Sequence, residues 1–192
     1  MAKLYFKYGA MGSGKTLELL RVAYNYIERG QNVLLLSSGQ DNRYGKNIIK
    51  SRTGIEMPSI SINDELDIIA LFTNENLKCA VDCILVDESQ FLSKKHIKQL
   101  SDIVDFYDTP VITYGLRSDS KLEPFEGSKY LMTIADDIQE IKSICWCGNK
   151  SIINARIIDG KISLDGPQIQ IGGNESYISL CRKHFKEGKL GK

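Results

Sequence analysis

Residues 9–16 read GAMGSGKT, and the rest of the chain can be interpreted outward from this stretch. It fits the pattern G-x-x-x-x-G-K-[ST], in which glycines let the backbone wrap a phosphate with inward-pointing N–H groups. The run Lys3–Tyr8 before it is rich in aromatics and is typical of a strand. Apolar residues follow at helical spacing up to Gly30, namely Leu17, Leu20, Ala23, Tyr24 and Ile27. The sequence therefore predicts a phosphate-binding loop between a strand and a helix.

Each residue type in this loop has a chemical reason to be there. Gly9, Gly12 and Gly14 allow the tight wrap, and the following helix adds the positive end of its dipole. We expect Lys15 to reach the β- and γ-phosphates of ATP and the Thr16 hydroxyl to bind Mg²⁺. The residues predicted to bind the nucleotide are Gly9, Ala10, Met11, Gly12, Ser13, Gly14, Lys15 and Thr16.

Two acids follow the apolar run Ile84-Leu85-Val86. In P-loop proteins an acid at the carboxyl end of a partner strand contacts the Mg²⁺ ion, and Asp87 holds that position and completes the predicted cofactor site. Glu88 comes one residue later, so its side chain points elsewhere and can act as a base near the γ-phosphate. Spacing alone leaves two reactions open: the base could activate water, as in ATPases and helicases, or a sugar hydroxyl, as in a kinase.

Strands and helices alternate up to about residue 140. The apolar run Asn32–Leu36 is typical of a buried parallel strand. Asn63 and Ser93 are expected to cap two helices, and Pro110 opens the strand 111–114. This order predicts an α/β fold: a P-loop parallel sheet with flanking helices. We also expect Gly45–Pro58 to form a mobile lid because of its mixed polar composition.

Cysteines and a histidine form two close pairs near the C-terminus. Cys145 and Cys147 form a C-x-C pair, and Cys181 and His184 form a C-x-x-H pair thirty-four residues later. Three thiolates and one imidazole are the ligands of a closed, tetrahedral zinc site of the structural kind. The sequence thus predicts structural Zn²⁺.

The alternation of strands and helices gives way to short β-like segments, cysteines and glycines where this predicted site begins. Residues 1–143 are predicted to form a nucleotide-binding α/β domain, and residues 144–192 a small zinc-binding module. Cys79 and Cys83 lie in or beside an apolar strand region and are expected in the core. His96 stands among lysines and is expected to be exposed.

Charge and composition exclude several classes of protein. The 192 residues carry 25 Lys and Arg against 24 Asp and Glu, a formal net charge of +1. Because binding to duplex DNA needs a basic surface, we expect no nucleic-acid partner. No apolar run approaches the ~20 residues that span a bilayer, and the first residues lack a secretion signal. Five cysteines, an odd count, argue against a disulfide framework. Together with the lack of a membrane span and a secretion signal, this predicts a cytoplasmic protein without a membrane partner.

Five stretches in the same order carry a family resemblance. GAMGSGKT is followed by DNRYG (41–45), VDESQFL (86–92), YGLRSD (114–119) and IGGNESYISLCRKH (171–184). Together they resemble the zinc-containing thymidine kinases, the family of cytosolic and bacterial thymidine kinase. The match runs over essentially the whole chain, which makes it far more specific than the phosphate loop alone.

The resemblance implies a reaction and roles for particular residues. The γ-phosphate of ATP would pass to the 5′-hydroxyl of thymidine, with deoxyuridine as a second acceptor and Glu88 as the catalytic base. Lys15 and Mg²⁺ would offset charge on the phosphoryl group, and Arg43, a further catalytic residue, would lie near the phosphates or the attacking hydroxyl on a loop that Asp41 helps to fix. The implied nucleoside pocket consists of Met11, Asp41, Gln90, Leu116, Ser120, Phe125, Ile171, Gly172, Gly173 and Tyr177. A homotetramer and feedback inhibition by dTTP are also implied.

One position departs from the family pattern. Ser120 stands where the family has a phenylalanine that packs on thymine, and Leu122 stands where glycine is common. Three outcomes stay open: Phe125 fills the gap, affinity is weaker, or the preferred base differs. Two alternatives to thymidine kinase are therefore kept, a deoxynucleoside kinase with a shifted base preference and a P-loop ATPase whose zinc module binds nucleic acid.

Overall fold

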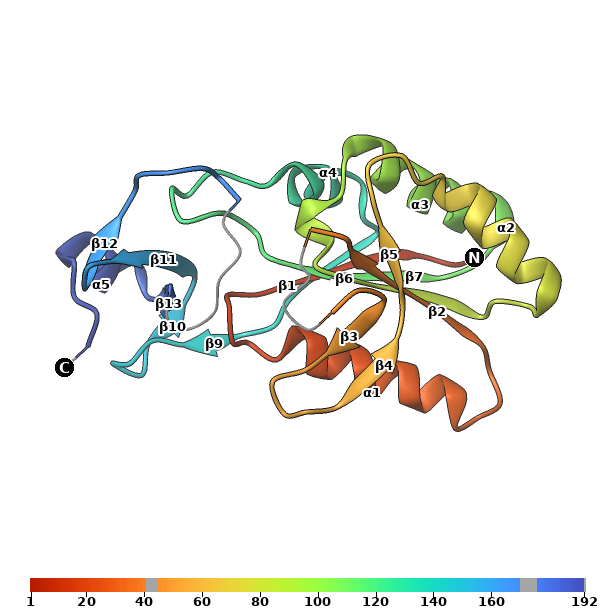
Figure 1. The fold of residues 1–192 in the computed structure, drawn as a ribbon, viewed down its shortest axis with the longest axis horizontal. Helices are drawn as coiled ribbons and strands as arrows, with labels where there is room; N and C mark the ends of the chain where they lie inside the picture. The colour runs from red at the N-terminus through yellow and green to blue at the C-terminus, as the bar shows by residue number, and fades with distance from the viewer. Residues whose placement is uncertain (41–44, 170–175, 192) are drawn as a thin grey trace.

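A central parallel sheet organises the structure, a computed structural model that describes residues 1–40, 45–169 and 176–191. Its six strands lie in the order β5-β2-β6-β7-β1-β8, and every neighbouring pair is parallel (Figure 1). They are β1 (Leu4–Tyr8), β2 (Val33–Ser38), β5 (Ile60–Ile62), β6 (Cys83–Asp87), β7 (Val111–Gly115) and β8 (Asp137–Glu140). The predicted α/β fold with a parallel sheet is confirmed.

Helices cover both faces of this sheet (Figure 1). The elements on one face are α2 (Ile68–Lys78), α3 (Lys94–Tyr107) and α4 (Glu126–Ile134), and those on the other are α1 (Lys15–Ile27) and the hairpin of β3 (Ile48–Lys50) and β4 (Glu56–Pro58). The first face buries Phe72, Leu100 and Leu131 against the strands. On the second face, Leu20 of α1 and Ile49 of β3 share one apolar cluster. Because both faces of the sheet are packed by these clusters, the sheet holds the loops at its carboxyl edge in position.

The helix starts follow from capping side chains. Ser93 caps α3 as predicted, because its hydroxyl accepts a hydrogen bond from the His96 backbone N–H. The prediction for Asn63 was wrong. Asp67 caps α2, accepting from the Ala70 N–H at 3.0 Å, while Asn63 closes the preceding turn. Both acceptors are common cap residues, and the sequence offered two of them four positions apart.

Two expectations about single residues are also corrected. His96 is 1% exposed, and its ring nitrogens lie 3.1 Å from the Ser93 hydroxyl and 3.3 Å from the Leu66 carbonyl oxygen. Its neighbouring lysines face solvent, so the helix carries both kinds of residue on different sides. Cys79 is exposed at the end of α2, whereas Cys83 is buried as expected.

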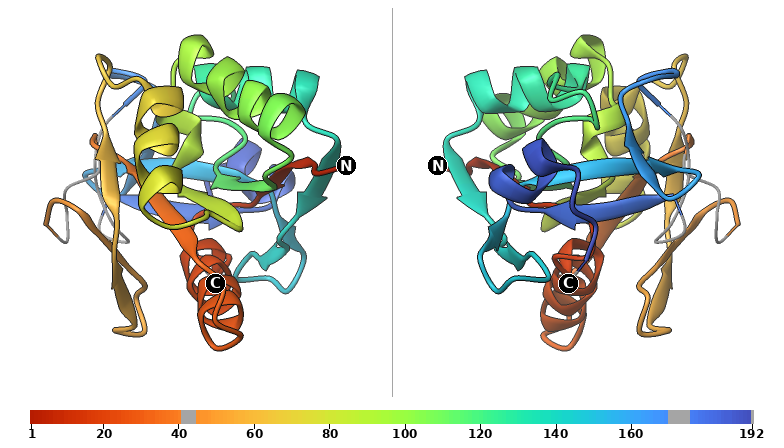
Figure 2. Two further views of the ribbon diagram at one scale, coloured as in Figure 1. Left: turned by 90° about the vertical axis from the view of Figure 1, so that its right-hand side faces the viewer. Right: turned by 90° about the vertical axis from the view of Figure 1, so that its left-hand side faces the viewer.

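The C-terminal part is built from short antiparallel strands and one short helix, seen in front of the sheet in the right panel of Figure 2. Its elements are β9 (Ser143–Ile144), β10 (Lys150–Ser151), β11 (Ile153–Ile158), β12 (Lys161–Ser163), β13 (Tyr177–Leu180) and α5 (Arg182–Glu187). β9 pairs with β10, and β11 lies between β12 and β13. A separate small apolar cluster includes Ala155 and Leu180. Among the described helices, none has the length and apolar character needed to cross a bilayer.

Candidate active site

A pocket of about 380 Å³ opens where the strands of the parallel sheet end. Open α/β sheets bind ligands at this carboxyl edge. The walls come from distant parts of the chain: the phosphate loop after β1, the β3–β4 hairpin, the turns after β6 and β7, and the C-terminal strands. Among the predicted phosphate and acid residues, Met11, Gly12, Gly14, Lys15, Thr16, Asp87 and Glu88 line this space together with predicted nucleoside residues, whereas Gly9, Ala10 and Ser13 do not line it.

The phosphate loop has the backbone that its glycines allow. Gly12 and Gly14 have φ of +73° and +87°, in the left-handed region that favours glycine. Lys15 is 7% exposed, and its Nζ donates to the carbonyl oxygens of Gly9 at 3.2 Å and Ala10 at 2.9 Å. Burial lowers the pKa of Lys15, and the nearby carboxylates of the pocket oppose that shift. A bound phosphate would give this ammonium group a charged partner in place of two neutral carbonyls.

A hydroxyl and a buried carboxylate meet beside the loop. The Thr16 Oγ1 donates to Asp87 Oδ2 at 2.9 Å, and Asp87 is 5% exposed. Burial, with the charge of Glu88 added, raises the pKa of Asp87 to about 7, although the Thr16 hydrogen bond acts in the opposite sense. These oxygen donors are of the hard type that Mg²⁺ prefers. A divalent cation here would offset the repulsion between the two acids, so the residues present fit the implied ion.

The position of Glu88 depends on an unusual backbone turn. Glu88 has φ +52° and ψ +38°, a left-handed conformation that few non-glycine residues adopt. Its Oε2 accepts a hydrogen bond from Gln90 Nε2 at 2.6 Å, and Gln90 Oε1 accepts from the Leu116 N–H at 3.0 Å. Gln90 thus links the Glu88 carboxylate to the turn after β7. The carboxylate is held at the pocket wall beside Asp87.

A further part of the pocket wall, called here the nucleoside end, holds residues that were predicted to bind the nucleoside. Its predicted lining residues are Met11, Gln90, Leu116, Ser120, Phe125 and Tyr177, and all of these line the pocket. Phe125 is 5% exposed and packs edge-on against Phe91, with ring centroids 5.5 Å apart. Ser120 is 3% exposed in the same wall. The predicted site residues Asp41, Arg43, Ile171, Gly172 and Gly173 lie outside the described residues.

Leu122, the second departure from the family pattern, also has a backbone that glycine adopts more easily. Its φ is +70°, and its N–H donates to the Asp119 carbonyl at 3.3 Å. The side chain is 49% exposed, so little packing compensates for the strain. The turn therefore retains the geometry that would suit a glycine.

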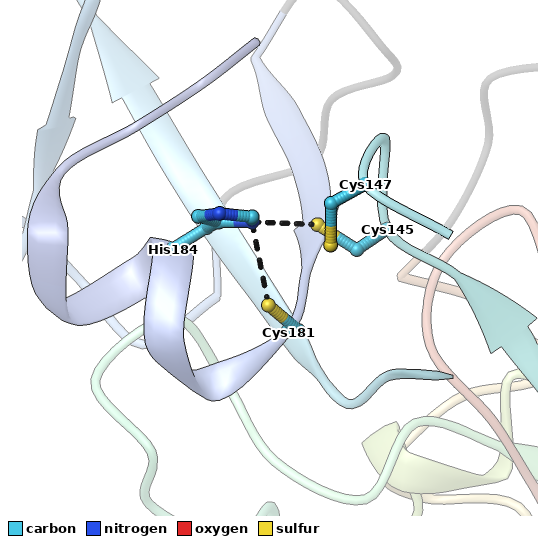
Figure 3. A group of neighbouring side chains, drawn as sticks. All are labelled: Cys145, Cys147, Cys181 and His184. Atoms are coloured by element: carbon cyan, nitrogen blue, oxygen red, sulfur yellow. Dashed lines mark hydrogen bonds between the residues drawn. The ribbon is translucent and has the colours of Figure 1, made fainter. Parts of the chain in front are cut away.

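The four predicted zinc ligands converge (Figure 3). The ligand atoms of Cys145, Cys147, Cys181 and His184 all lie within 4.8 Å of one another. His184 Nδ1 lies 3.5 Å from the Cys145 sulfur and 3.4 Å from the Cys181 sulfur. With Zn–S bonds of about 2.3 Å, tetrahedral ligands are spaced about 3.8 Å apart. The cluster therefore has the composition and nearly the spacing of a metal site.

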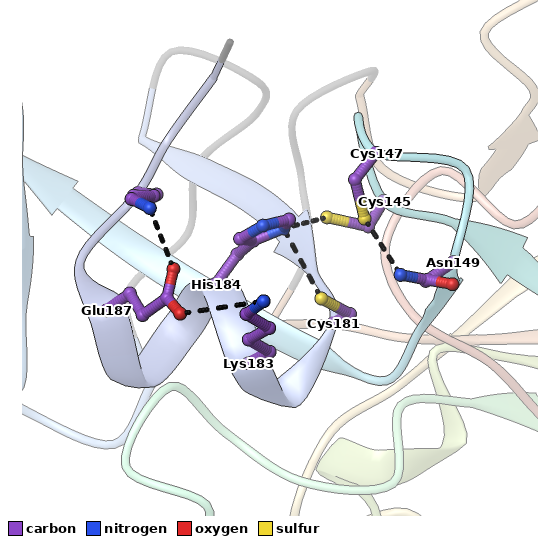
Figure 4. Close-up of polar contacts among 8 residues, drawn as sticks. Cys145, Cys147, Asn149, Cys181, Lys183, His184 and Glu187 are labelled. Carbon is purple, nitrogen blue, oxygen red and sulfur yellow. Dashed lines mark hydrogen bonds and ion pairs between the residues drawn. The ribbon is translucent and has the colours of Figure 1, made fainter.

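Neighbouring groups support these ligands. Asn149 Nδ2 donates to the Cys147 sulfur at 3.4 Å (Figure 4). The Trp146 ring stacks on His184, with centroids 4.1 Å apart and an interplanar angle of 18°. Burial raises the pKa of the Cys145 thiol, but hydrogen bonds from nearby backbone N–H groups outweigh it and lower that pKa to about 6. The thiolate form, which binds metal, is thereby favoured.

Sequence reasoning missed Arg156, which has the largest fully buried side chain in the described part of the protein. Its Nη1 donates to the Asp165 carbonyl at 2.6 Å and its Nη2 to the Pro167 carbonyl at 2.7 Å. Nε and Nη2 both lie 3.3 Å from the Tyr177 hydroxyl. Arg156 thus connects the backbone at 165–167, which leads to the pocket-lining Ile169, with the pocket-lining Tyr177. A lone arginine in a short β-like run carries no motif, so nothing in the sequence pointed to it.

Comparison with known proteins identifies the family. A family profile described as thymidine kinase matches residues 2–185. Thymidine kinase from Lactiplantibacillus plantarum is 48% identical over 186 residues, covering 96% of each chain. The enzyme from Zymomonas mobilis is 47% identical over 188 residues, covering 97% of each chain.

Structural likeness is weaker than sequence likeness. A Pif1 helicase from Candida albicans aligns with a TM-score of 0.46 and 12% identity, over 74% of this chain and 36% of the helicase. A structural similarity of this size does not support a conclusion about function. The sequence matches do identify the family, because the profile and both relatives span nearly the whole chain. The chain therefore belongs to the thymidine kinase family.

Proposed function

We propose that this chain transfers the γ-phosphate of ATP to the 5′-hydroxyl of thymidine, giving dTMP and ADP. The observation that carries the proposal is that the phosphate loop, Glu88 and the nucleoside end all line one pocket. A kinase that binds both substrates in one enclosed space gains mainly from positioning and electrostatic stabilisation. The family relatives, which are named thymidine kinases, support thymidine as the acceptor.

Glu88 is the proposed base. It takes the proton of the 5′-hydroxyl as the oxygen attacks the γ-phosphorus, and the bond from that phosphorus to the bridging oxygen of ADP breaks. Gln90 holds the Glu88 carboxylate in place through their 2.6 Å hydrogen bond. Lys15 leaves its carbonyl partners for the phosphates, and Thr16 and Asp87 would hold Mg²⁺. Magnesium supplies charge stabilisation on the phosphoryl oxygens.

Some proposed roles rest on family resemblance alone. Arg43, proposed to lie near the phosphates, and Asp41, proposed to fix that loop, lie outside the described residues. So do Ile171, Gly172 and Gly173, whose backbone we propose to hold the edge of the thymine base. The proposal also includes a homotetramer, feedback inhibition by dTTP, a cytoplasmic location and no nucleic-acid partner. A lid motion of 45–58 belongs to it as well, since the hairpin in that stretch lines the pocket.

The C-terminal part has a proposed purpose. We assign the Cys₃His cluster as a structural zinc site that holds a nucleoside-binding module, residues 144–192, next to the nucleotide-binding domain, residues 1–143. Support comes from the place of Tyr177, which lines the pocket on a strand that runs directly into the zinc ligand Cys181. Zinc here would have no part in the chemistry.

The aromatic pair Phe91 and Phe125 can stack on a base where Ser120 offers no ring, and the choice of thymidine rests on the named relatives. Phe125 and Phe91 line the pocket in edge-to-face contact, so an aromatic surface remains although Ser120 supplies none. With Mg-ATP, we expect the highest kcat/KM for thymidine and a lower value for deoxyuridine. The kcat/KM values for deoxycytidine, deoxyadenosine and deoxyguanosine should be at least about 10²-fold below that for thymidine. A higher kcat/KM for one of the last three would show a shifted base preference instead.

Arg156 gives a second test of the nucleoside end. Arg156→Met removes the hydrogen bonds that hold Tyr177 and the 165–167 backbone. Because charge-assisted hydrogen bonds are worth about 1.5–3 kcal/mol each, we expect the KM for thymidine to rise by about tenfold or more. At saturating thymidine, the KM for ATP should stay within about twofold, since none of the hydrogen bonds that Arg156 makes within the described residues reaches the phosphate loop. Steady-state kinetics for each substrate separates the two effects. An equal rise in both KM values would contradict a local role.

A further inference from the structure

Two side chains of the C-terminal part bind one residue of the phosphate loop. The Met11 N–H donates to Asn154 Oδ1 at 2.7 Å, and the Ser179 hydroxyl donates to the Met11 carbonyl oxygen at 2.7 Å. Asn154 on β11 and Ser179 on β13 lie directly opposite each other in the antiparallel pair. Both polar groups of one peptide residue are thus satisfied by a single cross-strand pair. We call Asn154 and Ser179 the Met11 clamp.

The clamp connects segments that are far apart in the sequence. Its two hydrogen bonds join residues 143 and 168 positions apart. Asn154 is 5% exposed, so its amide is removed from most competing water. Figure 1 shows the turn after β1 on the side of the sheet that faces β9, β10 and β13. The clamp is therefore a direct contact between the zinc-bearing part and the phosphate loop.

The same strands carry residues of the nucleoside end. Side chains two positions apart on a strand point to the same face. Tyr177 therefore lies beside Ser179 on β13, and its cross-strand partner Arg156 lies beside Asn154 on β11. A nucleoside that orders Tyr177 would also order β13 at Ser179. That strand in turn fixes Met11, which adjoins the loop glycine Gly12.

We propose that the Met11 clamp couples the two substrate sites, so that thymidine and ATP each raise the affinity for the other. The inference rests on the proposed function above. Asn154 and Ser179 act here through Met11 and are positioning residues for the phosphate loop. A first ligand that orders the strand and loop removes part of the ordering cost for the second. Linkage requires the effect to be reciprocal, whichever ligand binds first.

Calorimetric titration measures this coupling without turnover. Thymidine is titrated into the zinc-loaded protein with and without a saturating Mg²⁺ complex of a non-hydrolysable ATP analogue, and the ratio of the two Kd values is the coupling factor. We expect a factor of about 5 or more for the wild type. Ser179→Ala and Asn154→Ala should each bring it below about 2, because each removes one side of the clamp. Ser179→Thr keeps the hydroxyl and should keep the coupling.

Ser151→Ala is the matched control. Its hydroxyl contacts the β13 carbonyl of Leu180 and does not contact the phosphate loop, so this variant should retain the wild-type factor. Unchanged zinc content and Trp146 fluorescence in every variant show that the module is folded, since this single tryptophan stacks on His184. A wild-type factor of 1, or an undiminished factor in Ser179→Ala, overturns the inference while thymidine turnover leaves the proposed function intact. Absence of thymidine turnover in the wild type overturns both.

Discussion

Glu88→Gln lowers thymidine turnover by about 10²-fold or more, with the affinity for Mg-ATP little changed, if Glu88 is the base. The substitution removes the carboxylate that accepts the proton but keeps side-chain length and an oxygen that can accept the hydrogen bond from Gln90. The phosphate loop does not depend on this carboxylate for its own hydrogen bonds. We therefore expect kcat to fall while nucleotide binding persists.

Stopped-flow or steady-state assays measure kcat, and binding of a non-hydrolysable ATP analogue gives the affinity. Glu75→Gln is the matched control, because Glu75 lies on α2 and pairs with Lys78 away from the pocket. That variant should turn over thymidine at the wild-type rate. An unchanged kcat in Glu88→Gln would remove Glu88 from the mechanism.

Removing zinc, by chelation or by Cys145→Ser, is expected to abolish thymidine binding. The cluster joins the turn after β9 to the start of α5, and the C-terminal part has only a small apolar cluster of its own. In such modules metal binding supplies much of the folding free energy, about 10–16 kcal/mol for zinc-finger peptides. Without the metal, the strands that carry Tyr177 and Arg156 should lose their order. The α/β sheet keeps its own two cores and should keep its fold.

Trp146 fluorescence follows the loss directly, because the indole stacks on His184, one of the four residues proposed to bind zinc. Calorimetry with thymidine then tests the link between metal and substrate. The control is Cys79→Ser, which removes an exposed cysteine outside the cluster and should change neither signal. Normal thymidine binding by metal-free protein would show that zinc does not hold the nucleoside end.

Local, chemically constrained features could be predicted from the sequence. The phosphate loop was recognisable because its glycines, lysine and threonine must stand at fixed spacing around a phosphate. The Cys₃His cluster was recognisable because thiolates and imidazole in two close pairs have few other uses in a small module. In both cases the function dictates residue types over a few positions, so the pattern survives in the sequence.

Features that depend on tertiary contacts could not be predicted in this way. His96 was expected in solvent from its lysine neighbours, but the packing of α3 turns it toward Leu66. The cap of α2 moved from Asn63 to Asp67 because both residues can accept the same kind of hydrogen bond. The role of Arg156 could not be predicted because its hydrogen-bond acceptors are mostly backbone carbonyls, which every residue type provides.

The proposed reaction can be tested by following where the labelled γ-phosphate of ATP goes. The protein is incubated with Mg²⁺ and γ-labelled ATP, together with either thymidine or 5′-deoxythymidine, which lacks the attacking hydroxyl. We predict label in thymidine 5′-monophosphate in the first mixture and no labelled nucleotide product in the second. Label released only as inorganic phosphate, or transferred equally to 5′-deoxythymidine, would contradict a kinase that acts on the 5′-hydroxyl of thymidine.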